Sequence, residues 1–148
     1  MPPNRLTATE AAAKLQAELD AILLDVRPPS WYAQGHAAGA YNLPIFDVDA
    51  AGEKIENPQF VEQAAELFGK ERPIITICNA GPRSQQATGL LLEAGFSDVA
   101  DIAGGLKGKT DESGTKLVPG WIDAGLPVET EAQPGRDANS LMRKLKTG

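Results

Sequence analysis

The chain has 148 residues, of which 42% are hydrophobic and 23% charged, a composition typical of one soluble globular domain. Its net charge of -6 does not favour nucleic-acid binding, which requires a basic face. One cysteine and one histidine are too few for an intrachain disulfide or a Cys/His zinc site, and no apolar stretch approaches membrane-spanning length. We therefore expect a cytoplasmic protein that binds neither nucleic acid nor membrane and holds no metal.

Helical and strand patterns alternate along the chain, which is typical of parallel strands in an α/β fold. The predicted elements, in chain order, are a helix over 8–19, a strand over 21–26, a short helix within 28–35, a brief strand over 40–44, a helix over 59–68, a strand over 73–78, a helix over 84–94, a strand over 98–102 and a helical turn over 120–125.

Three details sharpen these predictions. A T-x-x-E capping box, formed by Thr7 and Glu10, marks the start of the first helix, and Leu19 is the last of its apolar positions. The apolar spacing predicts the inner face of the helix over 84–94, namely Ala87, Leu90, Leu91 and Ala94. The polar segment 130–148 predicts a flexible tail with one weak amphipathic turn, at Leu141, Met142 and Leu145.

Cys78 lies where the strand over 73–78 ends, shortly before a helix predicted to begin near Ser84. Ligands of open α/β sheets collect at this edge, where loop N–H groups and a helix dipole stabilise a thiolate, the reactive form of the thiol. Arg83 adds a permanent positive charge that suits an anionic substrate. A lone cysteine after an apolar strand is more often a small core residue, but the Gly-Pro-Arg-Ser sequence that follows favours a reactive thiol.

The segment CNAGPRS (residues 78–84) resembles the C-x-x-G-x-R-S active-site loop of single-domain rhodaneses, the thiosulfate sulfurtransferases. Three further segments resemble the same family in the same order, at 23–44, 90–105 and 120–129. The resemblance implies a rhodanese-like three-layer α/β fold, with a central, mainly parallel five-stranded sheet and helices on both faces. We expect this domain over residues 1–129, with an insertion at about 106–119 that forms a surface loop near the active-site rim.

The resemblance also implies a sulfurtransferase in which Cys78 attacks a small anionic donor such as thiosulfate, or a persulfide, and holds the sulfane sulfur as its own persulfide. Cyanide, a thiol or a sulfur carrier then accepts it, without any cofactor. The residues implied to bind the anion are Asn79, Ala80, Gly81, Arg83 and Ser84. Asp25 and Arg27 also match the family, and we expect them to form a salt bridge that anchors a loop near the site. His36 matches a position that we expect to be structural.

Two motifs suggest other ligands and fail on inspection. Residues 47–58 resemble a calcium loop at three positions, but Ala51 and Pro58 stand where ligands are required. Residues 103–110 (AGGLKGKT) fit a relaxed phosphate-binding pattern, but the next residues lack the helical spacing that such a loop must lead into.

Two other functions stay open. A cysteine-based phosphatase or arsenate reductase has five residues between its cysteine and arginine, whereas four separate Cys78 from Arg83. The shorter loop makes a smaller cradle, which favours a sulfur atom over a tetrahedral phosphate. A rhodanese-like sulfur-carrier or interaction module without turnover is the other alternative, and such modules commonly lack the cysteine.

Overall fold

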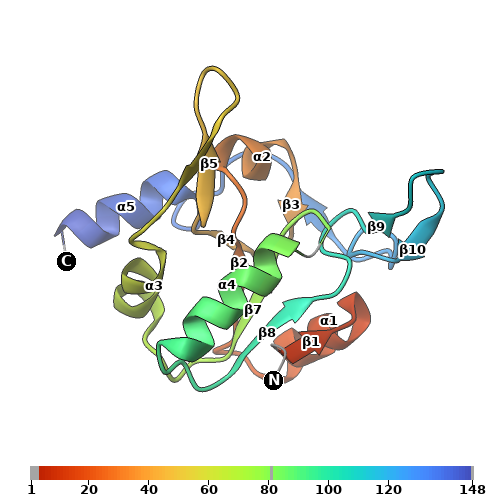
Figure 1. Cartoon of the computed structure of the whole chain (residues 1–148). Helices are drawn as coiled ribbons and strands as arrows, with labels where there is room; N and C mark the ends of the chain where they lie inside the picture. Colours follow the sequence, from red (N-terminus) through yellow and green to blue (C-terminus); the bar gives the residue numbers. More distant parts are fainter. Residues whose placement is uncertain (1–3, 81, 148) are drawn as a thin grey trace.

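The computed structural model describes residues 4–80 and 82–147, and its centre is a five-stranded sheet (Figure 1). The strand order is β1-β8-β7-β2-β4, and every neighbouring pair is parallel. The strands are β1 (Asn4–Leu6), β8 (Val99–Ile102), β7 (Ile74–Ile77), β2 (Ile22–Asp25) and β4 (Tyr41–Asn42). The predicted five-stranded, mainly parallel sheet is therefore confirmed.

Strand β7 occupies the middle of the sheet, and its residues, Ile74–Ile77, are all buried. Such a short β-branched run, covered on both faces, is typical of a central parallel strand. Ile77 stands opposite Asp25 in β2, so the carboxyl ends of β2 and β7 meet at one edge of the sheet. That edge is where Cys78 follows β7.

Helices cover both faces of the sheet, as predicted (Figure 1). They are α1 (Ala8–Ala17), α2 (Pro29–Gln34), α3 (Phe60–Phe68), α4 (Pro82–Glu93) and α5 (Ala138–Thr147). Ala8 and Ala11 of α1 pack with Ile75 and Ile77 in the core of one face. The core of the other face includes side chains from α3, α4 and α5. Because side chains alternate along β7, its neighbouring residues feed both cores.

The first helix begins as predicted but ends earlier. The Thr7 hydroxyl accepts a hydrogen bond from the Glu10 N–H, and the Glu10 carboxylate accepts one from the Thr7 N–H, so the capping box is complete. The helix stops at Ala17, and Leu19, predicted to lie on its buried face, is 92% exposed. Because the helix ends two residues before Leu19, this side chain is not held on the helical face that packs on the core.

Helix α4 starts at Pro82, two residues before the predicted start at Ser84. Proline suits the first turn of a helix because the N–H that it lacks would have no partner there. The buried positions of α4 are Ser84, Ala87, Thr88 and Leu91. Leu90 was predicted to face inward but is partly exposed, because the helix turns two polar residues toward the sheet instead. These are Ser84, which contacts Cys78, and Thr88, whose hydroxyl lies 2.8 Å from that of Thr76 in β7.

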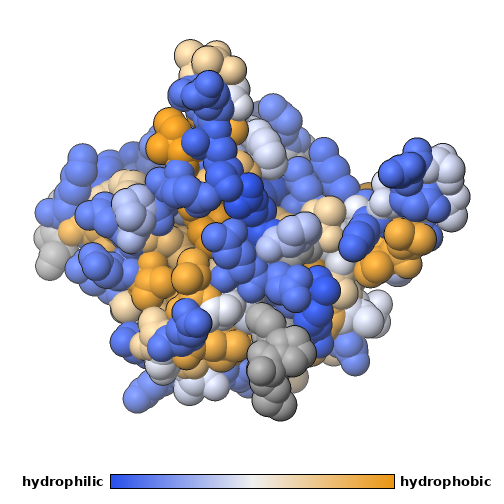
Figure 2. Space-filling view, in the orientation of Figure 1, coloured by the Kyte–Doolittle hydropathy of each residue, from blue (hydrophilic) through white to orange (hydrophobic). Residues whose placement is uncertain are grey.

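Three short strand pairs lie outside the central sheet and were not predicted. They are β5 (Phe46–Val48) with β6 (Lys54–Glu56), β9 (Lys109–Thr110) with β10 (Lys116–Val118), and β3 (His36–Ala37) with β11 (Val128–Glu129). The first two form hairpins that project from the body in different directions (Figure 1). The predicted surface loop at 106–119 is thus an antiparallel hairpin. Polar surface covers much of the face that carries both hairpins, with smaller hydrophobic areas between (Figure 2).

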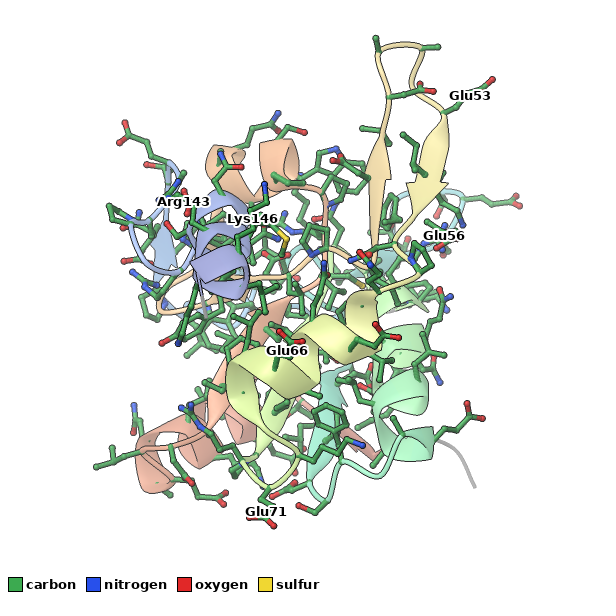
Figure 3. All side chains as sticks on the ribbon, turned by 90° about the vertical axis from the view of Figure 1, so that its left-hand side faces the viewer. Glu53, Glu56, Glu66, Glu71, Arg143 and Lys146 are labelled. Carbon is green, nitrogen blue, oxygen red and sulfur yellow. The ribbon has the colours of Figure 1, made fainter. Side chains whose placement is uncertain are left out.

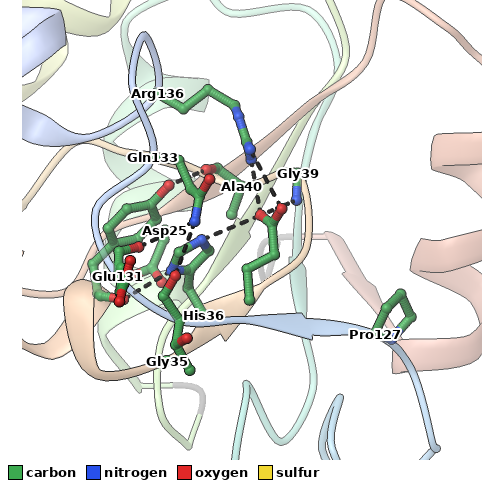
Figure 4. Close-up of polar contacts among 12 residues, drawn as sticks. Asp25, Gly35, His36, Gly39, Ala40, Pro127, Glu131, Gln133 and Arg136 are labelled. Atoms are coloured by element: carbon green, nitrogen blue, oxygen red, sulfur yellow. Dashed lines mark hydrogen bonds and ion pairs between the residues drawn. The ribbon is translucent and has the colours of Figure 1, made fainter.

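The segment after residue 130, predicted to be a flexible tail, is instead bound to the body. The N–H of Asn42 donates to the carbonyl of Arg136 at 2.8 Å, and the N–H of Glu131 donates to that of Ala33 at 2.7 Å. The Arg136 guanidinium contacts Glu129 at 3.1 Å, as the polar contacts in Figure 4 show. These bonds join the segment to β4, α2 and β11.

Helix α5 completes this segment and packs on α3. Leu141 and Ala138 are buried, and Met142 and Leu145 pack against the same core. Figure 3 shows the two helices together, with Glu66 on α3 and basic side chains on α5. The prediction failed because the tail's apolar residues are few, and the face of α3 that they cover is distant in sequence. Within the described part of the chain, no helix is both long and apolar enough to span a bilayer.

Candidate active site

Cys78 lies in the loop that joins β7 to α4, and its side chain is 1% exposed. Its Sγ lies 3.5 Å from the hydroxyl oxygen of Ser84, a buried residue in the first turn of α4. A hydroxyl at this distance is a suitable hydrogen-bond partner for a thiol or thiolate. Of the predicted neighbours, Asn79 and Ala80 lie in this loop and Ser84 lies in the first turn of α4, whereas Gly81 lies outside the described residues.

The first turn of α4 is held in place by hydroxyl groups beneath it. The Thr76 hydroxyl of β7 donates to the carbonyl of Ser84 at 3.0 Å and lies 2.8 Å from the hydroxyl of Thr88. All three residues are buried, so these contacts form away from competing water. These hydrogen bonds hold the first turn of α4 against β7, and so position the Ser84 hydroxyl next to the sulfur of Cys78.

The backbone of the cysteine loop is joined to the turn that follows β8. The N–H of Leu106 donates to the carbonyl of Cys78 at 2.7 Å, and the N–H of Lys107 donates to that of Asn79 at 2.8 Å. Gly105 allows this close approach: its φ is +59°, and an added Cβ would overlap the carbonyl oxygen of Cys78. Only glycine accommodates both the left-handed backbone and the contact. The turn therefore sets the position of the loop.

Asp25 and Arg27 form the predicted salt bridge, and it is buried. The Arg27 guanidinium donates to both carboxylate oxygens of Asp25, at 2.7 to 3.1 Å, and to the carbonyl of Gly35 at 2.6 Å. Its Nη1 donates to the side-chain oxygen of Asn79 at 3.0 Å. Asn42 donates to the carbonyls of both Asp25 and Arg27, which fixes the backbone of the pair. Arg27 thus links the end of β2 directly to the residue after Cys78.

Arg83 lies in the first turn of α4, but its guanidinium turns toward the β5–β6 hairpin. It stacks 4.7 Å above the ring of Phe46, and Nη1 lies 3.3 Å from Gln86 and 3.9 Å from Glu56. The acidic residues of this hairpin, including Glu53 and Glu56, are visible in Figure 3. The structure therefore places the charge of Arg83 on the hairpin side of the loop.

Asp101 is a residue of the site that sequence analysis did not identify. It lies on β8 with its side chain fully buried, and it accepts a hydrogen bond from Arg5 at 3.0 Å. Burial raises the pKa of this carboxyl group above its usual value, while Arg5 and the Ser84 hydroxyl oppose the rise. The carboxylate thus stands behind the hydroxyl that contacts the sulfur. An aspartate inside an apolar strand, VADI, was the signal in the sequence.

His36 lies apart from the cysteine loop and serves the packing of α2. Its ring stacks on Tyr32 at 3.7 Å, Nδ1 lies 2.8 Å from the Tyr32 carbonyl, and Nε2 lies 3.3 Å from Glu129 (Figure 4). These contacts support the structural role expected for it. Among the described residues, no three His, Cys, Asp or Glu side chains gather closely enough to hold a metal ion.

Two hollows flank the loop. A pocket of about 440 Å³ is lined by residues that include Arg27, Trp31, Asn79 and Lys107. A smaller one, of about 110 Å³, is lined by Ala80 of the loop, by Pro82 of α4 and by residues of the β9–β10 hairpin. The hairpin therefore borders the site, as predicted for the insertion.

Comparison with known proteins gives a consistent result. The family model of the rhodanese-like domain matches residues 7–112. The chain is 42% identical over 106 residues to "Thiosulfate sulfurtransferase 16, chloroplastic" of Arabidopsis thaliana, a match that covers 72% of this chain and 78% of that protein. It is 40% identical over 106 residues to "Senescence-associated protein DIN1" of Raphanus sativus, covering 72% of this chain but only 51% of that longer protein. The crystal structure of Rv0390 from M. tuberculosis shares the fold, with a TM-score of 0.72 at 22% identity over 87% of this chain and 98% of that one.

Proposed function

The chain belongs to the rhodanese-like domain family, and we propose that it is a sulfurtransferase that carries sulfane sulfur on Cys78. The observation that best supports this function is the position of Cys78. Its sulfur lies at the carboxyl edge of the central strand, next to the first turn of α4 and 3.5 Å from the Ser84 hydroxyl. N–H groups and the helix dipole at such an edge stabilise an anionic sulfur.

In the first step, the Cys78 thiolate attacks the outer sulfur of thiosulfate. A bond forms between the two sulfur atoms, the sulfur–sulfur bond of thiosulfate breaks, and sulfite leaves with the bonding pair. Cys78 then holds an anionic persulfide. In the second step, cyanide or a thiolate attacks the outer sulfur, the bond between that sulfur and Sγ breaks, and Cys78 is left as the thiolate. No general base is needed, because the attacking and leaving groups are already anions.

Mass spectrometry of the intact protein tests this proposal. Incubation with thiosulfate should add the mass of one sulfur atom, and cyanide should remove it again. Cys78→Ala should remain folded but gain no mass and show no turnover, whereas Ser84→Ala should still gain mass, at a lower rate. Equal thiosulfate:cyanide turnover by the wild type and Cys78→Ala would overturn the proposal.

The alternatives lead to different results. A non-catalytic module would hold sulfur without turning over, and a phosphatase or arsenate reductase would act on aryl phosphate or arsenate. The Arg83 guanidinium stacks on Phe46, a position that favours neither a tetrahedral anion nor thiosulfate, so the anion-binding role expected for Arg83 stays a prediction. The natural donor and acceptor, the absence of a cofactor and the cytoplasmic location stay predictions.

A further inference from the structure

Asn79, the residue that follows Cys78, forms part of the wall of the pocket of about 440 Å³. Its volume falls within the range of roughly 300–1,000 Å³ that is typical of small-molecule sites. Trp31 of α2, Ile122 of the turn after the insertion and Val128 of β11 supply its apolar surface. Ile122 is 48% exposed and Val128 42% exposed. A pocket with exposed branched side chains beside a reactive residue is suited to an apolar ligand.

The same pocket holds two donors for an anionic group. Lys107 is exposed, and its ammonium has no ion-pair partner among the described residues. Arg27 has five N–H groups, of which four donate to Asp25, Gly35 and Asn79. The remaining N–H, on Nη1, has no acceptor within the described part of the chain. Since the charge of Arg27 is balanced by Asp25, Lys107 supplies the net positive charge of the pocket.

We propose that this pocket binds the sulfur acceptor, and that the acceptor is an organic thiol with an apolar body and a carboxylate. The apolar body would lie against Trp31, Ile122 and Val128, and the carboxylate would pair with Lys107. This inference rests on the proposed sulfurtransferase function and names the substrate class of its second step. Cyanide is too small to use these contacts, so it reports on Cys78 alone.

The transfer balances without any further reactant. The thiol sulfur attacks the outer sulfur of the anionic Cys78 persulfide and forms a new sulfur–sulfur bond. The bond to Sγ of Cys78 breaks, and its electron pair stays on Sγ, which takes up the proton of the acceptor. The product leaves as an anionic persulfide that carries the carboxylate.

A matched pair of thiols tests the charge requirement. Protein loaded with sulfur from thiosulfate is mixed with 4-mercaptobenzoate, with its neutral analogue 4-mercaptobenzamide, or with cyanide, and loss of the persulfide is followed by mass. The wild type should prefer the carboxylate, and Lys107→Gln should reduce this preference roughly fivefold. Lys146→Gln, which removes the same charge from an exposed position on α5 that lines neither hollow beside the loop, should keep it. Ile122→Ser should slow both aromatic thiols but leave cyanide unchanged.

A binding measurement separates this proposal from the proposed function. The thioether 4-(methylthio)benzoate cannot accept sulfur, so its binding to Cys78→Ala, followed by calorimetry, depends on the pocket alone. Binding that weakens with Lys107→Gln and with Ile122→Ser supports the pocket. Binding that neither variant changes, or an unchanged carboxylate preference in Lys107→Gln, overturns it. Failure of the wild type to gain sulfur from thiosulfate would instead overturn the proposed function.

Discussion

Replacing Gly105 with alanine is expected to displace the cysteine loop while the sheet stays folded. Gly105 has a φ of +59°, and a Cβ there would overlap the carbonyl oxygen of Cys78 and lie 2.7 Å from the carbonyl carbon of Asn79. Both neighbours are backbone atoms, so no side-chain rotation can relieve the overlap. The loop must therefore move, and the two hydrogen bonds that it accepts from the following turn are lost.

The size of the effect follows from these contacts. A left-handed backbone costs a residue with a Cβ about 1–2 kcal/mol, and each lost hydrogen bond costs about 1 kcal/mol. The free energy of unfolding should fall by about 3–4 kcal/mol, which a typical domain tolerates. A displacement of about 1 Å at a reacting group lowers the rate on the order of 100-fold. Gly105→Ala should therefore lose sulfur transfer far more than it loses stability.

Gly114→Ala is the matched control. Gly114 also has a positive φ, +88°, but no heavy atom lies within 4 Å of an added Cβ. This variant should lose about 1–2 kcal/mol and transfer sulfur at the wild-type rate. Urea unfolding measures the stability, and the rate of mass gain from thiosulfate measures the transfer. The reasoning is refuted if Gly105→Ala matches the control in both.

Three further predictions concern stability, each followed by urea unfolding. Leu141→Ala removes a buried side chain and should lower the free energy of unfolding by about 2–5 kcal/mol. Leu19→Ala, at an exposed position, should lower it by less than about 0.5 kcal/mol. Equal losses would contradict the packing of α5. Asp25→Ala leaves the buried guanidinium of Arg27 unpaired and should cost about 3–5 kcal/mol of stability. Lys54→Ala, which breaks an exposed ion pair, should cost about 0–1 kcal/mol. Similar costs for the two variants would count against a stabilising role of the buried salt bridge. A guanidinium hydrogen bond lowers the pKa of Glu129 below its usual 4.5, so its contribution is present above pH 4.5 and is lost as the pH falls through the folded pKa. Glu129→Gln should therefore lose less stability on acidification than the wild type, and parallel pH profiles would show that the hydrogen bond contributes nothing.

The elements that sequence analysis predicted are those whose sequence patterns lie within the element itself. The apolar runs that became β2 and β7 and the capping box at Thr7 are readable within a few residues. The position of Cys78 at the end of β7 follows from the same patterns. Parallel pairing of β2 and β7 then brings Asp25 close to the loop. These parts of the fold and site were therefore predictable.

The elements that it missed depend on partners distant in sequence. Strand β1 has three residues and forms because it pairs with β8, where Arg5 also meets Asp101. Helix α5 has a short apolar face that acquires a partner only when α3 is folded. The direction of Arg83 depends on Phe46, a hairpin residue with no recognisable relation to the loop in the sequence. Tertiary contacts, rather than local propensity, decide each of these features.

The hydrogen bond from Asn42 to Arg136 has a consequence for solubility. Strand β4 is the last strand on its side of the sheet, and an uncovered strand at that position offers backbone donors and acceptors to other copies of the chain. The C-terminal segment occupies one of these donors, and α5 lies against β4 as well. Removal of the segment would open this side of the sheet to strand pairing between molecules. We therefore expect removal of the C-terminal segment to promote aggregation, whatever the segment contributes to catalysis.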